Sequence, residues 1–246
     1  MAVYNRRCSE RADDSKFVTD MPVRLSPLEA YRRWSQTWES DPSAIVALES
    51  RWLSPWLTGL DDQIFLDLSC GVGRWLIQAQ AQGAIVFGTD LCHEMLTEAR
   101  KKPTLSGKLA LADTRSLPFH DGFADIALCA LSLGHIAPME SAIMELARIV
   151  HQGGDLIITD FHPGALSHGW KRTFRSNGEL YEVETHPYTT AQLLQCAERN
   201  GLVLQELLEP CFDEPEQDIF RAAGKPDLFE QVRGIPAVLL ARWKRP

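Results

Sequence analysis

The sequence predicts an α/β fold in which helices cover both faces of a mainly parallel sheet. Between residues 60 and 160, short apolar segments that are typical of buried strands alternate with segments of helical periodicity. Four of the apolar segments end at an aspartate: Asp67, Asp90, Asp113 and Asp160. Because parallel strands end along one edge of their sheet, we expect a ligand site at this edge.

Composition and charge narrow the possible classes of function. The chain has 246 residues, 45% of them apolar, which suits one α/β domain with additions. A net charge of −8 argues against a nucleic acid partner. We expect no membrane partner and a cytoplasmic location, because no apolar run reaches the ~20 residues that cross a bilayer and no signal peptide is evident. The six cysteines form no close C-x-x-C pair and are predicted to be reduced thiols.

The N-terminal part is predicted to be helical after a flexible lead-in over residues 1–20. Ser26 and Glu29 form a capping box with Pro27 at the first helical position, and Tyr31 and Trp34 follow at helical spacing. Asp41-Pro42 predicts the start of a second helix. We expect one domain over 21–246, with its parts at 26–57 (N-terminal helices), 60–160 (core), 161–188 (insertion) and 189–246 (C-terminal part of the sheet).

The core is predicted to be built from five strands and three helices. The strands are expected over 64–67, 84–88, 108–112, 124–131 and 155–159, and the helices over 75–82, 92–102 and 139–150. Between the first strand and the first helix lies a turn with Gly71 and Gly73. Glycine lets the backbone approach a ligand closely, and such a turn directs free amide N–H groups at it.

The C-terminal part begins with an insertion that we expect to lie over the strand ends. Asn177-Gly178 predicts a hairpin between the segments 170–175 and 179–185, which mix basic and aromatic residues. These side chains are predicted either to hold an acceptor or to form a small separate core. A helix is expected over 190–200 and strands over 202–208 and 237–243, with a looser acidic stretch over 209–234.

In their order and spacing, these pieces resemble a class I S-adenosylmethionine-dependent methyltransferase over roughly residues 60 to 160. The residues that carry the resemblance are Asp67-Leu68-Ser69-Cys70-Gly71-Val72-Gly73, Gly88-Thr89-Asp90, Ala112-Asp113 with Leu117-Pro118-Phe119, Asp125-Ile126-Ala127-Leu128, and the segment from Glu145 to Gly154. The resemblance implies a Rossmann-like, doubly wound, seven-stranded sheet closed by an antiparallel pair. It also implies an N-terminal helical lid and a hairpin insertion after the fifth strand.

The resemblance further implies that S-adenosyl-L-methionine is the cofactor and S-adenosyl-L-homocysteine the product. Asp67 would support a backbone cradle for the methionine end, Asp90 would accept the ribose hydroxyls, and Asp113 would accept the adenine amino group. The expected cofactor-binding residues are Asp67, Ser69, Cys70, Gly71, Gly73, Asp90, Leu91, Asp113, Thr114 and Leu131. Ser69 stands where the family more often has glycine, so we expect its φ angle to be negative.

A nicotinamide-dependent oxidoreductase is the competing interpretation of the glycine turn. Its G-x-G-x-x-G fingerprint needs a third small residue, and from Gly71 the chain reads Gly-Val-Gly-Arg-Trp-Leu. Leu76 therefore stands where close helix packing favours glycine or alanine, which argues against this interpretation. A second alternative is a protein of the methyltransferase type that binds the cofactor without transferring methyl, as a sensor or partner subunit.

The acceptor is expected to be a small molecule, methylated on oxygen or carbon. After the fourth strand, Leu131-Ser132-Leu133 replaces the Asn/Asp-Pro-Pro-aromatic motif of methylases that act on base amino groups. His162 and His135 are candidate bases because histidine titrates near neutral pH. The expected substrate-side residues are Tyr31, Trp34, His186 and Tyr188. No third ligand accompanies Asp160 and His162, so no metal is expected; the oligomeric state is left open.

Overall fold

The computed structural model describes residues 21–246, and its main element is a seven-stranded sheet of order β4-β3-β2-β5-β6-β10-β9. The strands are β2 (Ile64–Leu68), β3 (Ile85–Asp90), β4 (Leu109–Leu111), β5 (Ala124–Ala130), β6 (Val150–Phe161), β9 (Val203–Leu208) and β10 (Val238–Lys244). Strand β10 runs antiparallel to β6 and β9, and the remaining pairs are parallel. The predicted doubly wound, mainly parallel sheet is confirmed. The predicted flexible lead-in over 1–20 lies outside the described residues.

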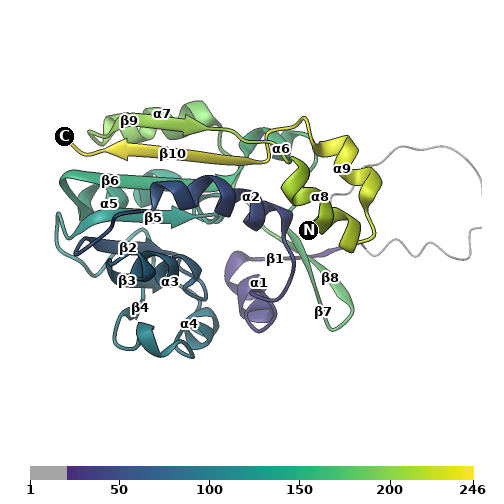
Figure 1. The fold of residues 1–246 in the computed structure, drawn as a ribbon, viewed down its shortest axis with the longest axis horizontal. Helices are drawn as coiled ribbons and strands as arrows, with labels where there is room; N and C mark the ends of the chain where they lie inside the picture. The colour runs from purple at the N-terminus through teal and green to yellow at the C-terminus, as the bar shows by residue number, and fades with distance from the viewer. Residues whose placement is uncertain (1–20) are drawn as a thin grey trace, which may run out of the picture.

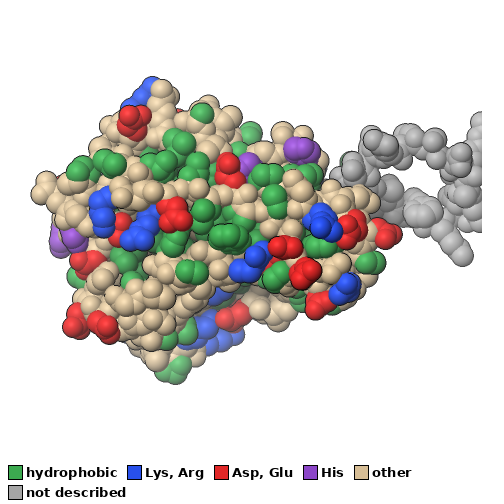
Figure 2. All heavy atoms as spheres, turned by 45° about the horizontal axis from the view of Figure 1, so that its top comes forward, with side chains coloured by type: hydrophobic (Ala, Val, Ile, Leu, Met, Phe, Trp, Pro, Cys, Tyr) green, Lys and Arg blue, Asp and Glu red, His purple; other side chains and the backbone are tan. Residues whose placement is uncertain are grey.

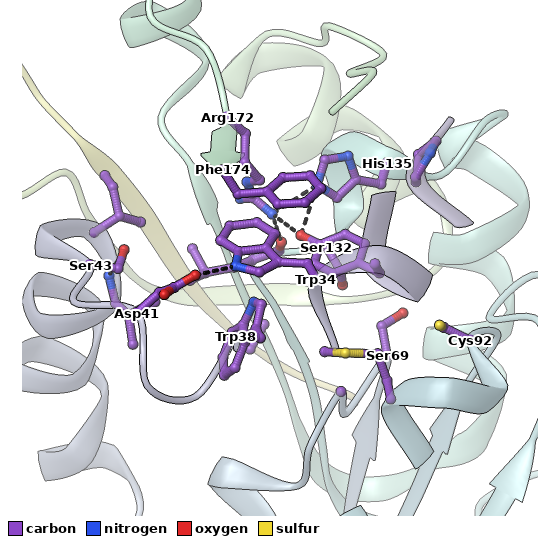
Figure 3. A pocket seen from close by; sticks show the side chains of 18 of the residues that line it. Trp34, Trp38, Asp41, Ser43, Ser69, Cys92, Ser132, His135, Arg172 and Phe174 are labelled. Atoms are coloured by element: carbon purple, nitrogen blue, oxygen red, sulfur yellow. Dashed lines mark hydrogen bonds between the residues drawn. The ribbon is translucent and has the colours of Figure 1, made fainter. Parts of the chain in front are cut away.

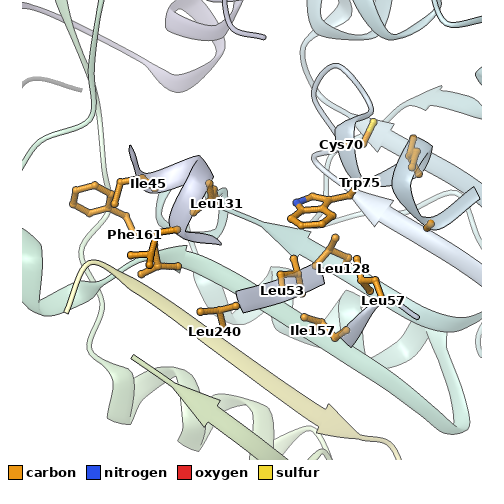
Figure 4. Packing of buried hydrophobic residues seen from close by; sticks show 14 of the residues in the cluster. Ile45, Leu53, Leu57, Cys70, Trp75, Leu128, Leu131, Ile157, Phe161 and Leu240 are labelled. Carbon is orange, nitrogen blue, oxygen red and sulfur yellow. The ribbon is translucent and has the colours of Figure 1, made fainter. Parts of the chain in front are cut away.

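Helices cover the two faces of this sheet (Figure 1). Helices α5 (Met139–Ile149) and α7 (Thr190–Arg199) pack on one face, and α2 (Ala44–Leu53), α3 (Arg74–Ala81) and α4 (His93–Ala99) pack on the other. Alternate residues of β2 serve the two faces, because Phe65 joins the core under α2 and α3 while Leu66 joins the core under α5. In Figure 4, Trp75 of α3 and Leu53 of α2 lie over strand residues such as Leu128.

A second, three-stranded sheet lies at the end of the main sheet toward which the β5 arrow points (Figure 1). It consists of β1 (Val23–Leu25), β8 (Glu179–Val183) and β7 (Thr173–Ser176) in the order β1-β8-β7, with α1 (Pro27–Trp34) packed on it. The predicted hairpin is confirmed: Asn177 (φ 52°) and Gly178 (φ 83°) form its turn, and both adopt the positive φ that a two-residue type I′ turn needs.

Polar N-cap residues mark the starts of α1 and α2, but the cap of α2 differs from the predicted one. The capping box of Ser26 and Glu29 is confirmed at the start of α1. Helix α2 is capped by Ser43, two residues after the predicted start at Asp41. The carboxylate of Asp41 is already engaged, because it accepts hydrogen bonds from Trp34 Nε1 (2.8 Å) and Thr37 Oγ1 (3.2 Å).

The expectation of a looser stretch over 209–234 is wrong. This stretch contains α8 (Glu214–Ala222), which begins with a capping box of Asp213 and Glu216, and α9 (Pro226–Val232). Aromatic contacts hold these helices together: Phe220 lies 5.1 Å from Phe212 and 5.7 Å from Phe229 between ring centroids. Such contacts leave little trace in the local sequence pattern. Helix α6 (Pro163–Ser167) completes the described helices longer than one turn.

The surface carries acidic and basic side chains side by side. Figure 2 shows them interspersed on one face, without a broad area of a single sign. No helix of the described chain is long and apolar enough to cross a membrane. Five cysteines lie within residues 21–246, all as free thiols: Cys70, Cys92, Cys129, Cys196 and Cys211.

Candidate active site

The glycine turn between β2 and α3 brings backbone amides to the carboxyl end of the sheet. Gly71 (φ 55°) and Gly73 (φ 81°) are left-handed, and a Cβ atom at Gly73 would lie 2.6 Å from Leu105 Cδ1. Ser69 also has a positive φ, 59°, so the expectation that it avoids this region is wrong. Its hydroxyl lies 3.2 Å from the Thr114 hydroxyl, a side-chain contact that glycine could not make.

Asp90 ties the end of β3 to this turn. Its Oδ2 accepts the Gly71 N–H at 2.8 Å, and its Oδ1 accepts the Cys92 N–H at 2.7 Å. Burial raises the pKa of Asp90, while these two N–H donors favour its ionised form. Each carboxylate oxygen can accept more than one hydrogen bond, so Asp90 keeps capacity for two ligand hydroxyls.

Asp67 leaves an unsatisfied acceptor at the same edge. Its side chain is 1% exposed, and Oδ1 has no hydrogen-bond partner within the described chain. Burial raises the pKa of Asp67 well above its usual range, and the nearby Arg74 opposes this shift. A buried acceptor without a donor is costly. The site therefore fits a cofactor that brings hydroxyl and ammonium donors, as S-adenosylmethionine does.

Asp113 has a different environment. Both of its carboxylate oxygens accept hydrogen bonds from Arg115, whose Nη2 lies 2.6 Å from Oδ2. The hydrogen bond with Arg115 lowers the pKa of Asp113 despite partial burial. Asp113 and Thr114 are not among the residues that line the cavity described next, so contact between Asp113 and the adenine stays a prediction.

A cavity of about 430 Å³ extends from the strand ends to α1 and the hairpin (Figure 3). The predicted residues that line it are Asp67, Ser69, Cys70, Gly71, Asp90, Leu91, Leu131, His135, Tyr31 and Trp34. Among its other lining residues are Trp38, Arg74, Met95, Ser132, Phe161, Arg172, Phe174, Arg175 and Lys225. Gly73, His162, His186 and Tyr188 do not line it. The cavity thus joins the expected cofactor residues to aromatic side chains of the predicted lid.

Stacked rings form one wall of the cavity. Trp34 stacks on Phe174 of the hairpin, with ring centroids 4.6 Å apart, and on Tyr31 at 5.8 Å. The Trp34 indole is held in place by its hydrogen bond to Asp41 (Figure 3). This wall can accommodate a flat or apolar molecule and keep water from it. Phe174 belongs to the segment 170–175 that was expected either to hold an acceptor or to form a small separate core, whereas Trp38 was not among the predicted substrate-side residues.

His135 is held as a neutral imidazole. Its Nδ1 lies 2.9 Å from the Glu184 carbonyl and must donate to it, so Nε2 carries the lone pair that faces Arg172 Nη1 (2.8 Å) and the Tyr31 hydroxyl (3.2 Å). Burial and the Arg172 charge lower the pKa of His135 to about 3. A lone pair that is already engaged and so weakly basic is a poor proton acceptor. The role of His135 as a base stays a prediction that this geometry does not favour.

The depressed pKa of His135 predicts a pH-dependent stability. Below pH 6.5 the unfolded chain binds a proton at this residue and the folded chain does not, so stability falls as pH falls. Between pH 6.5 and 5, we expect this residue to reduce the free energy of unfolding by about 1.5 kcal/mol. Urea unfolding of the wild-type chain and of His135→Gln at both pH values measures the difference. His93→Gln, at an exposed histidine away from His135, is the control, and an equal pH dependence in all three chains would contradict the prediction.

His162 lies beside the end of β6 but outside the cavity lining. Its Nδ1 accepts the Gly164 N–H at 3.0 Å and thereby caps α6, and its Nε2 lies 3.0 Å from Glu209 Oε1. Both ring nitrogens are therefore engaged in structural contacts. A catalytic role for His162 stays a prediction, and the geometry points to a capping role.

His186 and Tyr188, the other two residues predicted on the substrate side, lie outside the main cavity. His186 is exposed and its backbone N–H donates to the Gly134 carbonyl at 2.7 Å. The Tyr188 hydroxyl donates to Asp160 Oδ2 at 2.9 Å and lines only a small separate cavity. Neither is brought to the main cavity. Within residues 21–246, no group of three or more His, Cys, Asp or Glu side chains is arranged to hold a metal ion.

Known proteins resemble the chain in sequence mainly over its core. Residues 66–158 match the family model described as "Methyltransferase domain". A demethylmenaquinone methyltransferase of Thermus thermophilus is 36% identical over 103 residues, which are 40% of this chain and 47% of that protein. The chain spans less than half the length of the curated relatives it matches.

Solved structures share the fold over most of the chain. An S-adenosylmethionine-dependent methyltransferase of Mesorhizobium loti has a TM-score of 0.65 at 21% identity, over 83% of this chain and 99% of that one. Geranyl diphosphate C-methyltransferase of Streptomyces coelicolor has a TM-score of 0.63 at 15% identity, over 82% and 81%. Because the sequence identities are only 21% and 15%, these similarities establish a shared fold.

Proposed function

This chain carries a class I S-adenosylmethionine-dependent methyltransferase domain, and we propose that it transfers the methyl group of that cofactor to oxygen or carbon of a small molecule. The observation that carries the proposal is the continuous cavity between the strand-end carboxylates and the aromatic wall. One end offers acceptors for the donors of the cofactor, and the other offers apolar surface for an acceptor molecule. Demethylmenaquinone, the acceptor in the name of one relative, is one candidate.

The residues of the chain mainly bind, orient and exclude water. When bound, the cofactor supplies a methyl group on a positively charged sulfonium, which is already an activated leaving group. Asp90 and the amides of the glycine turn would hold it by the hydrogen-bonding capacity described above, and Asp67 would receive one of its donors. The stacked wall of Trp34 and Phe174 would position the acceptor, since correct orientation accounts for much of the catalysis of such a transfer.

The described cavity lining offers no basic imidazole, and this limits the kinds of acceptor that can react there. Within the described cavity lining, the histidine is His135, whose pKa is lowered to about 3. An acceptor that arrives with an anionic oxygen or an electron-rich carbon needs no base at neutral pH. This supports acceptors of the phenolate, carboxylate or enolate kind over neutral alcohols.

A melting curve with S-adenosylhomocysteine, and with NADH as the comparison ligand, tests the cofactor. At about 100 times its dissociation constant, a specific ligand adds ~2.7 kcal/mol, so the midpoint should rise by about 5–10 °C with S-adenosylhomocysteine alone. A rise with NADH alone would contradict the proposal. Transfer of a labelled methyl group to phenols, carboxylates and quinone precursors then separates an enzyme from a protein that only binds the cofactor.

A further inference from the structure

Arg172, just before β7, reaches the cavity from the hairpin, and one end of its guanidinium group is fixed by the protein. Nη1 lies 2.6 Å from the Leu131 carbonyl oxygen, 2.8 Å from the Tyr31 hydroxyl and 2.8 Å from His135 Nε2. The side chain is only 14% exposed. These contacts join the hairpin, α1 and the end of β5, so the group has a defined orientation before any ligand binds (Figure 3).

The other edge of this guanidinium group, formed by Nε and Nη2, makes no hydrogen bond to any residue in 21–246. Asp160 Oδ1 lies 3.8 Å from Nη2, beyond hydrogen-bond distance. The Asp160 carboxylate is occupied elsewhere, because it accepts the Phe161 N–H, the Gly134 N–H and the Tyr188 hydroxyl. The free edge carries two parallel N–H donors, the arrangement that matches the two oxygens of a carboxylate.

Basic lining residues gather at the hairpin end of the cavity. Asp67 and Asp90 lie beside the glycine turn, at the end expected for the cofactor. The lining residues Arg172 and Arg175 come from the hairpin side, and Lys225 precedes α9. Arg74, a further lining arginine, is paired with the buried Glu49, and Arg175 donates to the Gly178 carbonyl oxygen at 3.1 Å. Asp41 also lines the hairpin end, but its carboxylate already accepts hydrogen bonds from Trp34 and Thr37, whereas Arg172 keeps an unused donor edge.

An apolar surface adjoins the guanidinium group. Phe174 follows Arg172 by two residues, and its ring stacks on Trp34, which in turn stacks on Tyr31. Tyr31 also contacts Arg172 through its hydroxyl. This contact is made by Nη1, so an acceptor that lies against the rings would adjoin the guanidinium group of Arg172, which also lines the cavity.

We propose that the methyl acceptor is a planar, apolar acid whose carboxylate is bound by the Nε and Nη2 edge of Arg172 while its ring lies against Trp34 and Phe174. This inference rests on the proposed function and specifies its acceptor class. Arg172 then acts as a specificity-determining residue. A bidentate, charge-assisted pair distinguishes an acid from its neutral amide of the same shape.

Calorimetric titration of the full chain, saturated with S-adenosylhomocysteine, tests this with 2-naphthoate and 2-naphthamide as matched probes. The acid should bind about tenfold or more tightly than the amide. Arg172→Gln should remove this preference by weakening the acid alone, and Arg172→Lys should keep only part of it, because lysine retains the charge but not the fork. Lys171→Gln is the control, since Lys171 pairs with Glu182 outside the cavity lining.

The outcomes separate the two proposals. Equal binding of acid and amide by the wild-type chain, or no binding of the acid at about 1 mM, would overturn the assignment of Arg172 while S-adenosylhomocysteine still binds. An unchanged preference in Arg172→Gln would overturn it as well. Failure of the wild-type chain to bind S-adenosylhomocysteine would instead overturn the proposed function. A melting shift with S-adenosylhomocysteine in each variant shows that it is folded.

Discussion

Asp90→Ala is expected to weaken the binding of S-adenosylhomocysteine by about tenfold or more, because a hydrogen bond to a charged group contributes roughly 1.5–3 kcal/mol. The substitution removes the expected acceptor for the ribose hydroxyls. It also leaves the N–H groups of Gly71 and Cys92 without the partner that orders the glycine turn against β3. Both effects act on the cofactor end of the cavity.

Isothermal titration with S-adenosylhomocysteine measures this change, and two variants sharpen it. Asp90→Asn keeps one oxygen acceptor and should lose less affinity than Asp90→Ala. Asp113→Ala, at the next strand end, should have a smaller effect than Asp90→Ala, because Asp113 is engaged by Arg115 and does not line the described cavity. An unchanged affinity of Asp90→Ala would remove Asp90 from the cofactor site.

Glu49→Ala is expected to lower the free energy of unfolding by about 3 kcal/mol, since removal of one partner from a buried ion pair leaves an uncompensated charge. Glu49 is fully buried in α2, where one carboxylate oxygen accepts a hydrogen bond from Arg74 of α3 and the other accepts one from the Thr159 hydroxyl of β6. The carboxylate therefore connects three elements behind the cavity. Within residues 21–246, Arg74 would keep the Ser50 hydroxyl and the Trp75 ring as close partners.

Urea unfolding followed by circular dichroism measures the loss. Glu49→Gln should cost less, because the amide can still accept one of the two hydrogen bonds. Glu39→Ala is the control: its ion pair with Lys102 is exposed, and such pairs contribute about 1 kcal/mol or less. A change within about 1 kcal/mol for Glu49→Ala would show that the pair contributes no more than a surface contact.

Much of the strand-end part of the cavity, where we propose that the cofactor binds, could be predicted from the sequence. Strand periodicity places Asp67 and Asp90 at strand ends, and the topology of a parallel sheet brings those ends together. The glycine turn and the Asn177-Gly178 hairpin depend on backbone angles that few residues adopt, so they leave a signal in the sequence. Ser69 is the exception, because a residue other than glycine adopts the left-handed region there.

The acceptor end was decided by tertiary structure. His135 and His162 look equivalent in sequence, since each follows a strand, yet one is held by Arg172 from 37 positions away and the other caps α6 against Glu209. Local patterns arise from periodicity and turn chemistry, which act over a few residues. The protonation and orientation of a side chain depend on burial and on partners brought in by folding. The sequence alone therefore determined the sheet and the edge that we propose binds the cofactor, whereas only the packing of α1 and the hairpin on that edge decided which groups line the aromatic end of the cavity.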